Sequence, residues 1–187
     1  TASIDTDIVV SNCDPPFFYN RVVPDYLNKK WNEKRLKKMS YSMGLFVWYF
    51  ATKKEYKDVE HHTIIMGKTF KKVLNDIYNK KVISNDLSLY LHRPSATDKD
   101  FDPSGNDSFY VLAPVPHNGS GINWAEKGEE IRLQVQRQLE NTLLPELEQN
   151  IVESFFVTPE TFSDKFNSFY GAGFSIAPKL TQSAWFL

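Results

Sequence analysis

The chain has 187 residues, of which 41% are hydrophobic and 14% aromatic, enough to bury the core of one ordinary domain and to exclude a disordered chain. Charged residues make up 24% and the mean hydropathy is -0.43, which excludes an integral membrane protein. The net charge of -1 argues against a nucleic-acid partner. Cys13 is the single cysteine, so an intrachain disulfide is excluded and a reducing compartment is indicated.

Short apolar or alternating runs predict the strands. Residues 7–11 read as a buried strand that ends before Pro15 and Pro16, and Cys13 beside it is expected in the core. Residues 43–50 are apolar on both alternating sets, as in a strand covered on both faces. Pro114 and Pro116 confine another strand to an edge or an end of its sheet. The predicted strands cover residues 7–11, 43–50, 62–66, 87–92, 109–115 and 151–157.

Helical spacing predicts three helices between and after these strands. Apolar residues at 70, 73, 74, 77 and 78 form the stripe of a helix that packs by one face. Apolar residues every four positions predict a second helix over about 128–144, which Pro145 interrupts. Thr158 and Pro159 start a third, and Gly171 ends it. The sequence therefore predicts an α+β fold with a mixed, largely antiparallel sheet backed by helices.

Several motifs that would carry metal or nucleotide chemistry are incomplete. Residues 67–69 end like a phosphate-binding loop, but His62 stands where that loop needs glycine. Three aspartates from Asp98 onward have calcium-loop spacing, but Pro103 occupies the position of the required glycine. We predict no metal site, because four histidines lack ligand-like spacing: His61, His62, His92 and His117.

A basic segment at residues 26–38 has the composition of a stretch that lies on an anionic membrane surface. Basic side chains alternate there with aromatic and leucine side chains that could enter the interface. The alternative is a solvated basic loop or helix that covers part of the core. The residues expected to contact a membrane are Trp31, Lys34, Arg35, Lys37 and Lys38.

Five blocks of this sequence resemble the bacterial carotenoid desaturases, with phytoene desaturase as the nearest type. They stand in that family's order and at close to its spacing, over nearly the whole chain. The blocks are MSYSMGLFVWYF (39–50), HHTIIMGK (61–68), SLYLHRPSATD (88–98), SFYVLAPVPH (108–117) and FYGAGFSIAPKLTQSAWF (169–186).

The resemblance implies an FAD-dependent oxidoreductase of carotenoid biosynthesis. Such an enzyme passes an allylic hydride of phytoene, or of its partly desaturated products, to FAD and releases a proton, which leaves a conjugated double bond. A carotenoid or polyisoprenoid substrate implies a cytoplasmic enzyme that is peripheral on the inner face of the membrane. Two alternatives remain: another carotenoid-modifying flavoprotein, such as a later-step desaturase, an isomerase or a ketolase, and a noncatalytic lipid-binding module.

The glycine-rich FAD motifs of the family are absent from these 187 residues. We therefore expect an internal piece of a longer protein, inactive on its own. The resemblance implies that residues 1–14 are a strand and turn returning to the FAD-binding domain. It assigns residues 15–170 to the substrate domain and residues 171–187 to the start of a return to the FAD-binding domain.

The resemblance also nominates binding residues, although it assigns no catalytic residue. Asn12 and Asp14 follow the strand expected beside the flavin, with an Asx turn as the alternative. For the aromatic candidates the alternative is a core role, and Gln182 could instead bond to backbone. The residues expected to bind substrate are Tyr170, Phe174, Gln182 and Trp185.

Overall fold

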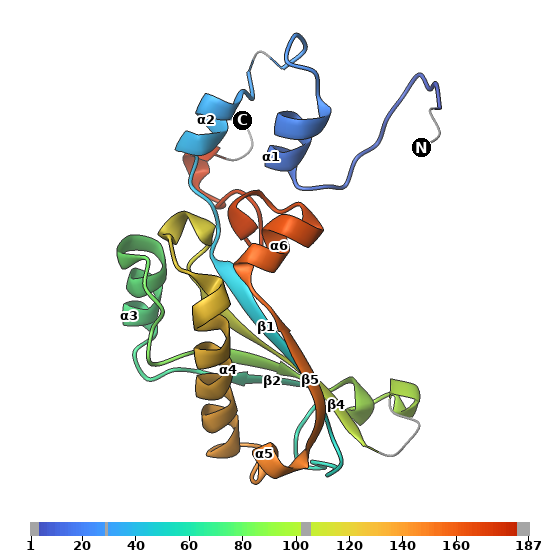
Figure 1. Ribbon diagram of the computed structural model, residues 1–187, viewed down its shortest axis with the longest axis vertical. Coiled ribbons are helices and arrows are strands. Elements are labelled where there is room, and N and C mark those ends of the chain that lie inside the picture. Colours follow the sequence, from blue (N-terminus) through green and yellow to red (C-terminus); the bar gives the residue numbers. More distant parts are fainter. Residues whose placement is uncertain (1–3, 29, 102–105, 183–187) are drawn as a thin grey trace.

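A computed structural model describes residues 4–28, 30–101 and 106–182 of the chain (Figure 1). Five strands form one open sheet in the order β2-β3-β4-β1-β5. Every described strand pair is antiparallel. The predicted α+β fold is confirmed, but the sheet is antiparallel throughout these pairs and not mixed. The strands are β1 Gly44–Thr52, β2 His62–Ile65, β3 Leu89–His92, β4 Asp107–Val115 and β5 Ile151–Val157.

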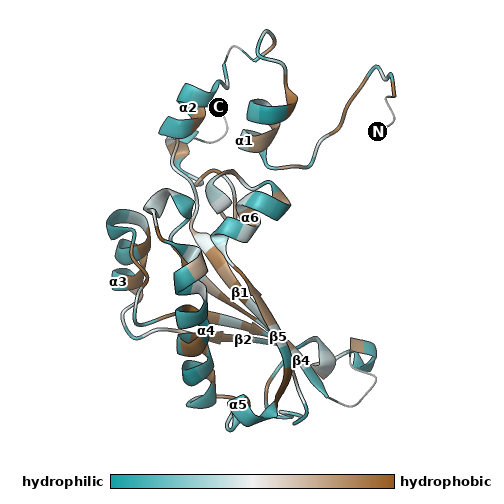
Figure 2. Ribbon diagram, viewed as in Figure 1, coloured by the Kyte–Doolittle hydropathy of each residue, from teal (hydrophilic) through white to brown (hydrophobic). Residues whose placement is uncertain are grey.

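The core lies between one face of the sheet and α4, the long helix in Figure 1. Trp48 and Phe46 on β1 are fully buried, and so are Ile131, Val135 and Leu139 on α4. Figure 2 shows this division: the strands are mostly brown, while α4 carries hydrophilic teal residues on its outer side. Removal of these apolar side chains from water contributes most of the free energy that holds the sheet and helix together as one unit.

Local residue chemistry sets where the helices begin and end. α4 begins at Trp124, earlier than predicted, because the side chain of Asn123 caps it by accepting from the Ala125 N–H at 3.2 Å. It ends at Glu140, before the disruptive Pro145. The helices are α1 Pro15–Phe17, α2 Glu33–Lys38, α3 Phe70–Asn75, α4 Trp124–Glu140, α5 Leu147–Asn150 and α6 Pro159–Phe166.

The predicted start of α6 is confirmed and its predicted end at Gly171 is wrong. Thr158 and Thr161 form a capping box ahead of the first turn. The helix stops at Phe166 because Asn167 adopts the left-handed conformation with φ 57°, which asparagine tolerates better than most residues.

The strand predicted at residues 7–11 is not present. These residues run as an irregular, exposed segment, which appears as a brown stretch of the N-terminal arm in Figure 2. Ile8 is 78% exposed and Val10 is 93% exposed, and Cys13 is exposed rather than in the core. The segment is apolar, but no described strand pairs with it.

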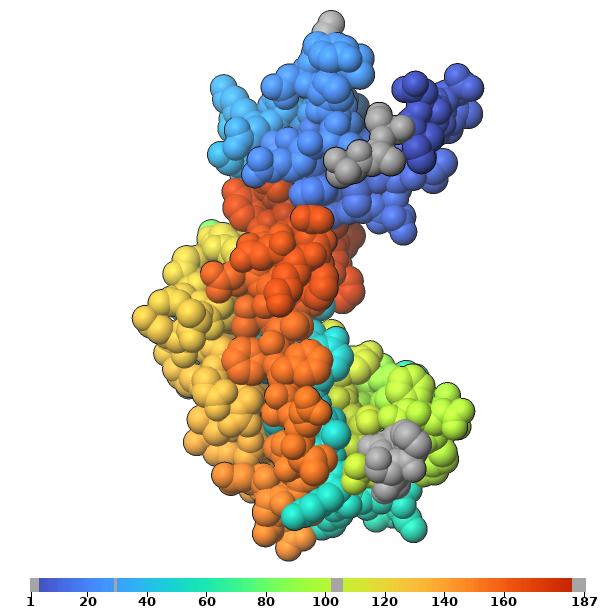
Figure 3. Space-filling view, turned by 45° about the vertical axis from the view of Figure 1, so that its right-hand side comes forward, coloured from blue at the N-terminus to red at the C-terminus, as the bar shows by residue number. Residues whose placement is uncertain are grey.

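Residues 40–43 and the C-terminal segment (residues 169–182) run antiparallel beside each other between the sheet and the N-terminal residues, joined by isolated bridges and backbone hydrogen bonds. The Gly173 N–H donates to the Met43 carbonyl and the Ala177 N–H to the Ser40 carbonyl. In the other direction, the Ser42 N–H donates to the Ser175 carbonyl. In Figure 3 this C-terminal segment, orange to red, lies between the blue N-terminal residues and the sheet. Among the described residues, no helix combines the length and apolar character that a membrane crossing requires.

Candidate functional site

One ring from each of the five strands forms a continuous row across the sheet, which we call the aromatic row. Strand register places His62 opposite His92, His92 opposite Tyr110, Tyr110 opposite Tyr49, and Tyr49 opposite Phe155. Neighbouring ring centroids lie 5.1, 4.6, 5.6 and 4.8 Å apart in that order. These separations are those of favourable aromatic pairs.

The aromatic row lies on the face of the sheet opposite to α4. Side chains alternate along β1, so Trp48 and Phe50 point to the core while Tyr49 between them points to the other face. Tyr49, Tyr110 and His92 are half-buried, and Phe155 is 60% exposed. Most exposed sheet faces are polar, so a five-ring stripe on this face indicates a surface that contacts something apolar.

Burial shapes the ionisation of two rings in the row. It raises the pKa of Tyr110 to about 12, helped by its hydrogen bond with Tyr90. It lowers the pKa of His92, and the neighbouring His61 and His62 add to that effect. Both shifts favour the uncharged form of the ring.

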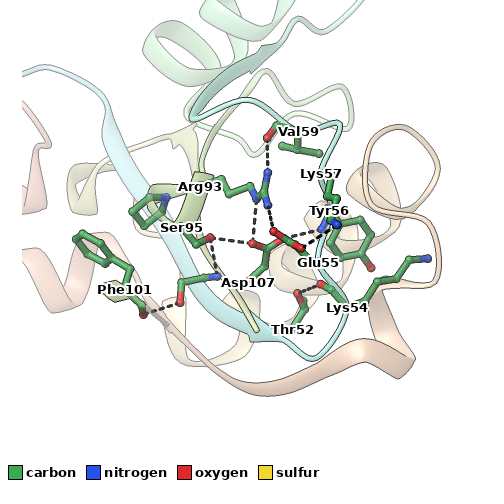
Figure 4. Close-up of polar contacts among 12 residues, drawn as sticks. Thr52, Lys54, Glu55, Tyr56, Lys57, Val59, Arg93, Ser95, Phe101 and Asp107 are labelled. Atoms are coloured by element: carbon green, nitrogen blue, oxygen red, sulfur yellow. Dashed lines mark hydrogen bonds and ion pairs between the residues drawn. The ribbon is translucent and has the colours of Figure 1, made fainter. Parts of the chain in front are cut away.

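A buried ion pair holds the strand ends beside the row (Figure 4). Arg93 Nε donates to Asp107 Oδ1 at 3.0 Å, and its Nη1 donates to the Val59 carbonyl at 2.9 Å. Asp107 also accepts from the Ser95 hydroxyl and from the Tyr56 N–H. Arg93 directly follows His92, so this network fixes the end of β3 from which His92 projects.

A second candidate surface is an open, mainly apolar pocket of about 590 Å³, which we call the junction pocket. It lies where the N-terminal residues meet the C-terminal segment. Gln182 lies at its wall and donates to the Ser40 carbonyl at 3.0 Å while accepting from the Ser40 N–H at 2.8 Å. The lining includes Pro16, Tyr19, Trp31, Leu36, Ile176 and Gln182.

The residues predicted to bind substrate do not gather at one place. Tyr170 lines a different pocket, where its ring stacks on His117 at 5.7 Å. Burial lowers the pKa of that histidine. Phe174 is 63% exposed, and Trp185 lies outside the described residues. Gln182 bonds to backbone, which is the alternative given above for it; its contact with a substrate remains a prediction.

The carboxylate of Asp14 ties the N-terminal residues to the C-terminal segment. One oxygen accepts from the Phe169 N–H at 2.7 Å and the other accepts from the Ser175 hydroxyl. An Asx turn is wrong for Asp14, because Pro15 and Pro16 have no N–H to donate to it. Asn12 is exposed.

The basic segment folds into a loop and the short helix α2. Trp31 stacks on Tyr19 at 5.6 Å and lies under the Arg35 guanidinium at 4.3 Å, so its ring faces the protein. Lys37 pairs with Glu33 at 2.7 Å, and this contact raises the pKa of the lysine. Lys34 and Lys38 are exposed. The exposed apolar side chains of this region are Val22, Tyr26 and Leu27.

Comparison with known proteins finds similar sequences along nearly the whole chain. No family model matches the chain. Over 98% of its length, the chain is 44% identical to the neurosporene-forming phytoene desaturase of Rhodobacter capsulatus. Along nearly its whole length, the chain is thus similar to a part of bacterial phytoene desaturases. It is also 38% identical to the lycopene-forming phytoene desaturase of a Paracoccus species, and 31% identical to the zeta-carotene-forming phytoene desaturase of Myxococcus xanthus. It covers 36%, 37% and 34% of these three proteins, so the chain spans about a third of the length of the curated relatives it matches.

The aromatic row is the feature that sequence reasoning missed. Alternation shows that Tyr90 and His92 lie opposite the leucines of their strand, which is a usable signal. The row itself depends on the register of four strand pairs, and no local sequence pattern predicts that register.

Proposed function

We propose that the chain is part of an FAD-dependent desaturase that introduces conjugated double bonds into phytoene or its partly desaturated products. The observation that carries this proposal is the 44% identity to a phytoene desaturase over 98% of the chain. Residues 15–170 then contribute the substrate domain of that enzyme. Relatives with different named products match this chain. The number of desaturation steps is therefore to be measured from the products that the enzyme forms.

The aromatic row supports a role in substrate contact. A polyene hydrocarbon has no hydrogen-bonding group, so its binding energy comes from apolar contact area. The row offers five rings in one line across the sheet, with Tyr49 and Phe155 stacked at an interplanar angle of 13°. We infer that the extended hydrocarbon chain of the substrate lies against this face of the sheet in the complete enzyme.

The described residues do not form a cradle for FAD. The sequence has no glycine-rich turn of the dinucleotide-binding kind. Asp14 already uses both carboxylate oxygens within the protein. We therefore propose that FAD, which supplies the hydride-accepting chemistry when bound, is held chiefly by parts of the enzyme outside these 187 residues. Contacts of Asn12 and Asp14 with it remain a prediction.

Truncation of one exposed ring tests the substrate-contact proposal. In the complete enzyme, Phe155→Ala is expected to lower phytoene conversion about tenfold, because a lost aromatic contact of about 1.5–3 kcal/mol corresponds to that factor or more. Stability should change little, since the ring is 60% exposed. The measurement is carotenoid composition by chromatography after expression in a phytoene-accumulating host, together with the melting temperature.

Phe166→Ala is the matched control. Phe166 has the same side chain and is 59% exposed, but it lies on α6 outside the aromatic row. Equal losses of phytoene conversion in both variants would show that the aromatic row does not contact the substrate. Unchanged phytoene with the unmodified enzyme would reject the desaturase and favour a lipid-binding module. If phytoene were unchanged but a supplied, partly desaturated carotenoid were consumed, the result would favour a later-step desaturase.

We further propose that the enzyme works as a peripheral protein on the inner face of the membrane, where residues 26–38 meet the lipid. Exposed Tyr26 and Leu27 lie in the same segment as exposed Lys34 and Lys38, a combination suited to an anionic interface. Trp31 is a weaker candidate for insertion, since its ring packs against Tyr19.

Changing Lys34 and Lys38 together to glutamine is expected to weaken liposome binding of the complete enzyme by about tenfold or more at low salt. Each basic residue near an anionic surface contributes about 1 kcal/mol. The measurement is sedimentation with vesicles containing anionic lipid at two salt concentrations. Lys127→Gln, on the partly exposed surface of α4, is the control and should leave binding unchanged. Equal binding by all three proteins would support the solvated-helix alternative.

A further inference from the structure

Three histidines converge at the β2–β3 edge of the sheet. His62 starts β2 and lies opposite His92 at the end of β3, while His61 immediately precedes β2. One ring nitrogen from each of the three lies within 4.8 Å of the other two. The Nε2 atoms of His61 and His92 are 2.7 Å apart. Ring nitrogens of three imidazoles therefore meet in one small volume, and one of the two Nε2 atoms carries the hydrogen of the short contact.

Outer partners orient two of these rings. His61 Nδ1 lies 2.6 Å from Thr97 Oγ1, and His62 Nδ1 lies 2.7 Å from the Tyr90 hydroxyl. Each oxygen can accept a hydrogen bond from Nδ1–H, which leaves the Nε2 lone pair of that ring for another partner. Histidines that bind metals are commonly fixed in this way, with the second nitrogen donating to an oxygen.

The backbone under the cluster is also held in place. The Arg93 N–H donates to the His61 carbonyl at 2.9 Å, and the Arg93 guanidinium donates to the Val59 carbonyl. Arg93 itself is anchored on the buried Asp107. The segment before β2 is thus attached to the end of β3 by bonds independent of the imidazoles, so the three rings are brought together before any ligand arrives.

We propose that His61, His62 and His92 form a binding site for a divalent transition-metal ion of the zinc class. Three imidazole ligands suit Zn²⁺, and three protein ligands leave a fourth position open to water. Tetrahedral bonds of about 2.0–2.1 Å place ligand nitrogens about 3.3 Å apart. The 2.7 Å separation of His61 and His92 therefore opens by roughly 0.6 Å when the ion binds. His62 is exposed, which gives the ion a route from solvent.

The site would clamp the edge of the sheet at one end of the aromatic row. β2 is an edge strand that pairs with β3 over four residues, 62–65 with 89–92. An ion shared by His62 and His92 adds a cross-strand link to that short pairing. Binding to the folded state alone then raises the melting temperature with ion concentration.

The test is calorimetric titration of Zn²⁺ into the full chain without a polyhistidine tag. All proteins carry Cys13→Ser, because the exposed thiol is a competing ligand. We expect one ion per chain, a higher melting temperature with Zn²⁺, and a tetrahedral visible spectrum when Co²⁺ replaces it. His62→Gln should weaken binding at least tenfold, since even loss of an outer partner costs a metal site about 10–100-fold.

His117→Gln is the matched control, because His117 lies outside the cluster and stacks on Tyr170. It should retain the binding of the parent. His62 is exposed, so its variant should keep the fold, which circular dichroism verifies. The proposal is overturned if the parent binds no stoichiometric ion. It is also overturned if His62→Gln and His92→Gln bind as tightly as the parent.

Discussion

Replacing Arg93 by methionine is expected to destabilise the protein by about 3–5 kcal/mol, because it leaves a buried carboxylate without its cation. Arg93 is 3% exposed and Asp107 is fully buried, so water cannot replace the lost partner. The same change removes the bond to the Val59 carbonyl (Figure 4). Urea denaturation followed by circular dichroism measures the effect.

Lys37→Met is the control for this prediction. Lys37 also forms a close ion pair, at 2.7 Å from Glu33, but both side chains are largely exposed. Water screens an exposed pair within a helix, so this variant should be nearly as stable as the parent. Similar losses in the two variants would show that burial does not govern the strength of the Arg93 pair.

The sheet is the part of the fold that local sequence pattern predicts well. Residues 43–50 are apolar on both alternating sets, and β1 is buried on both of its faces from residue 44 to residue 48. The prediction that Pro114 and Pro116 confine their strand to an edge or an end of its sheet is wrong, because β4 is the central strand. Pro114 fits there because it lies near the end of β4, beyond residue 112, where the pairing with β3 stops.

Features that depend on long-range partners could not be predicted in the same way. The aromatic row and the histidine cluster both require that His62 lie opposite His92, far along the chain. Local spacing led to the expectation that no metal site exists, although ligands from two paired strands need no regular spacing. The apolar run at residues 7–11 indicated burial, yet burial requires a partner surface that no described residue supplies.

The candidate site shows a similar division. The sequence marks the block from residue 169 onward as important, and the structure places Tyr170 and Gln182 beside two different pockets. Gln182 stands out as a polar residue among apolar neighbours, and its amide holds the Ser40 backbone. A polar side chain among apolar neighbours needs hydrogen-bond partners, and the Ser40 backbone supplies them. These bonds explain the presence of Gln182 without a ligand.

Gly171→Ala is expected to destabilise the protein by about 2 kcal/mol or more, through two effects at one residue. Gly171 has φ +62°, where an L side chain is strained. A Cβ there would also lie 2.0 Å from the Pro159 carbonyl oxygen, and that carbonyl belongs to the first residue of α6. Thermal unfolding and urea denaturation measure the loss.

Gly121→Ala separates the two effects. Gly121 has a similar left-handed φ of +77°, but its Cβ would meet no atom within 4 Å. Its substitution should cost only the backbone strain, about 1 kcal/mol. The difference between the two variants then measures the close approach of the C-terminal segment to α6. If the two losses were equal, that close contact would contribute nothing, and the segment that carries Tyr170 would be held to α6 by its backbone conformation and hydrogen bonds alone.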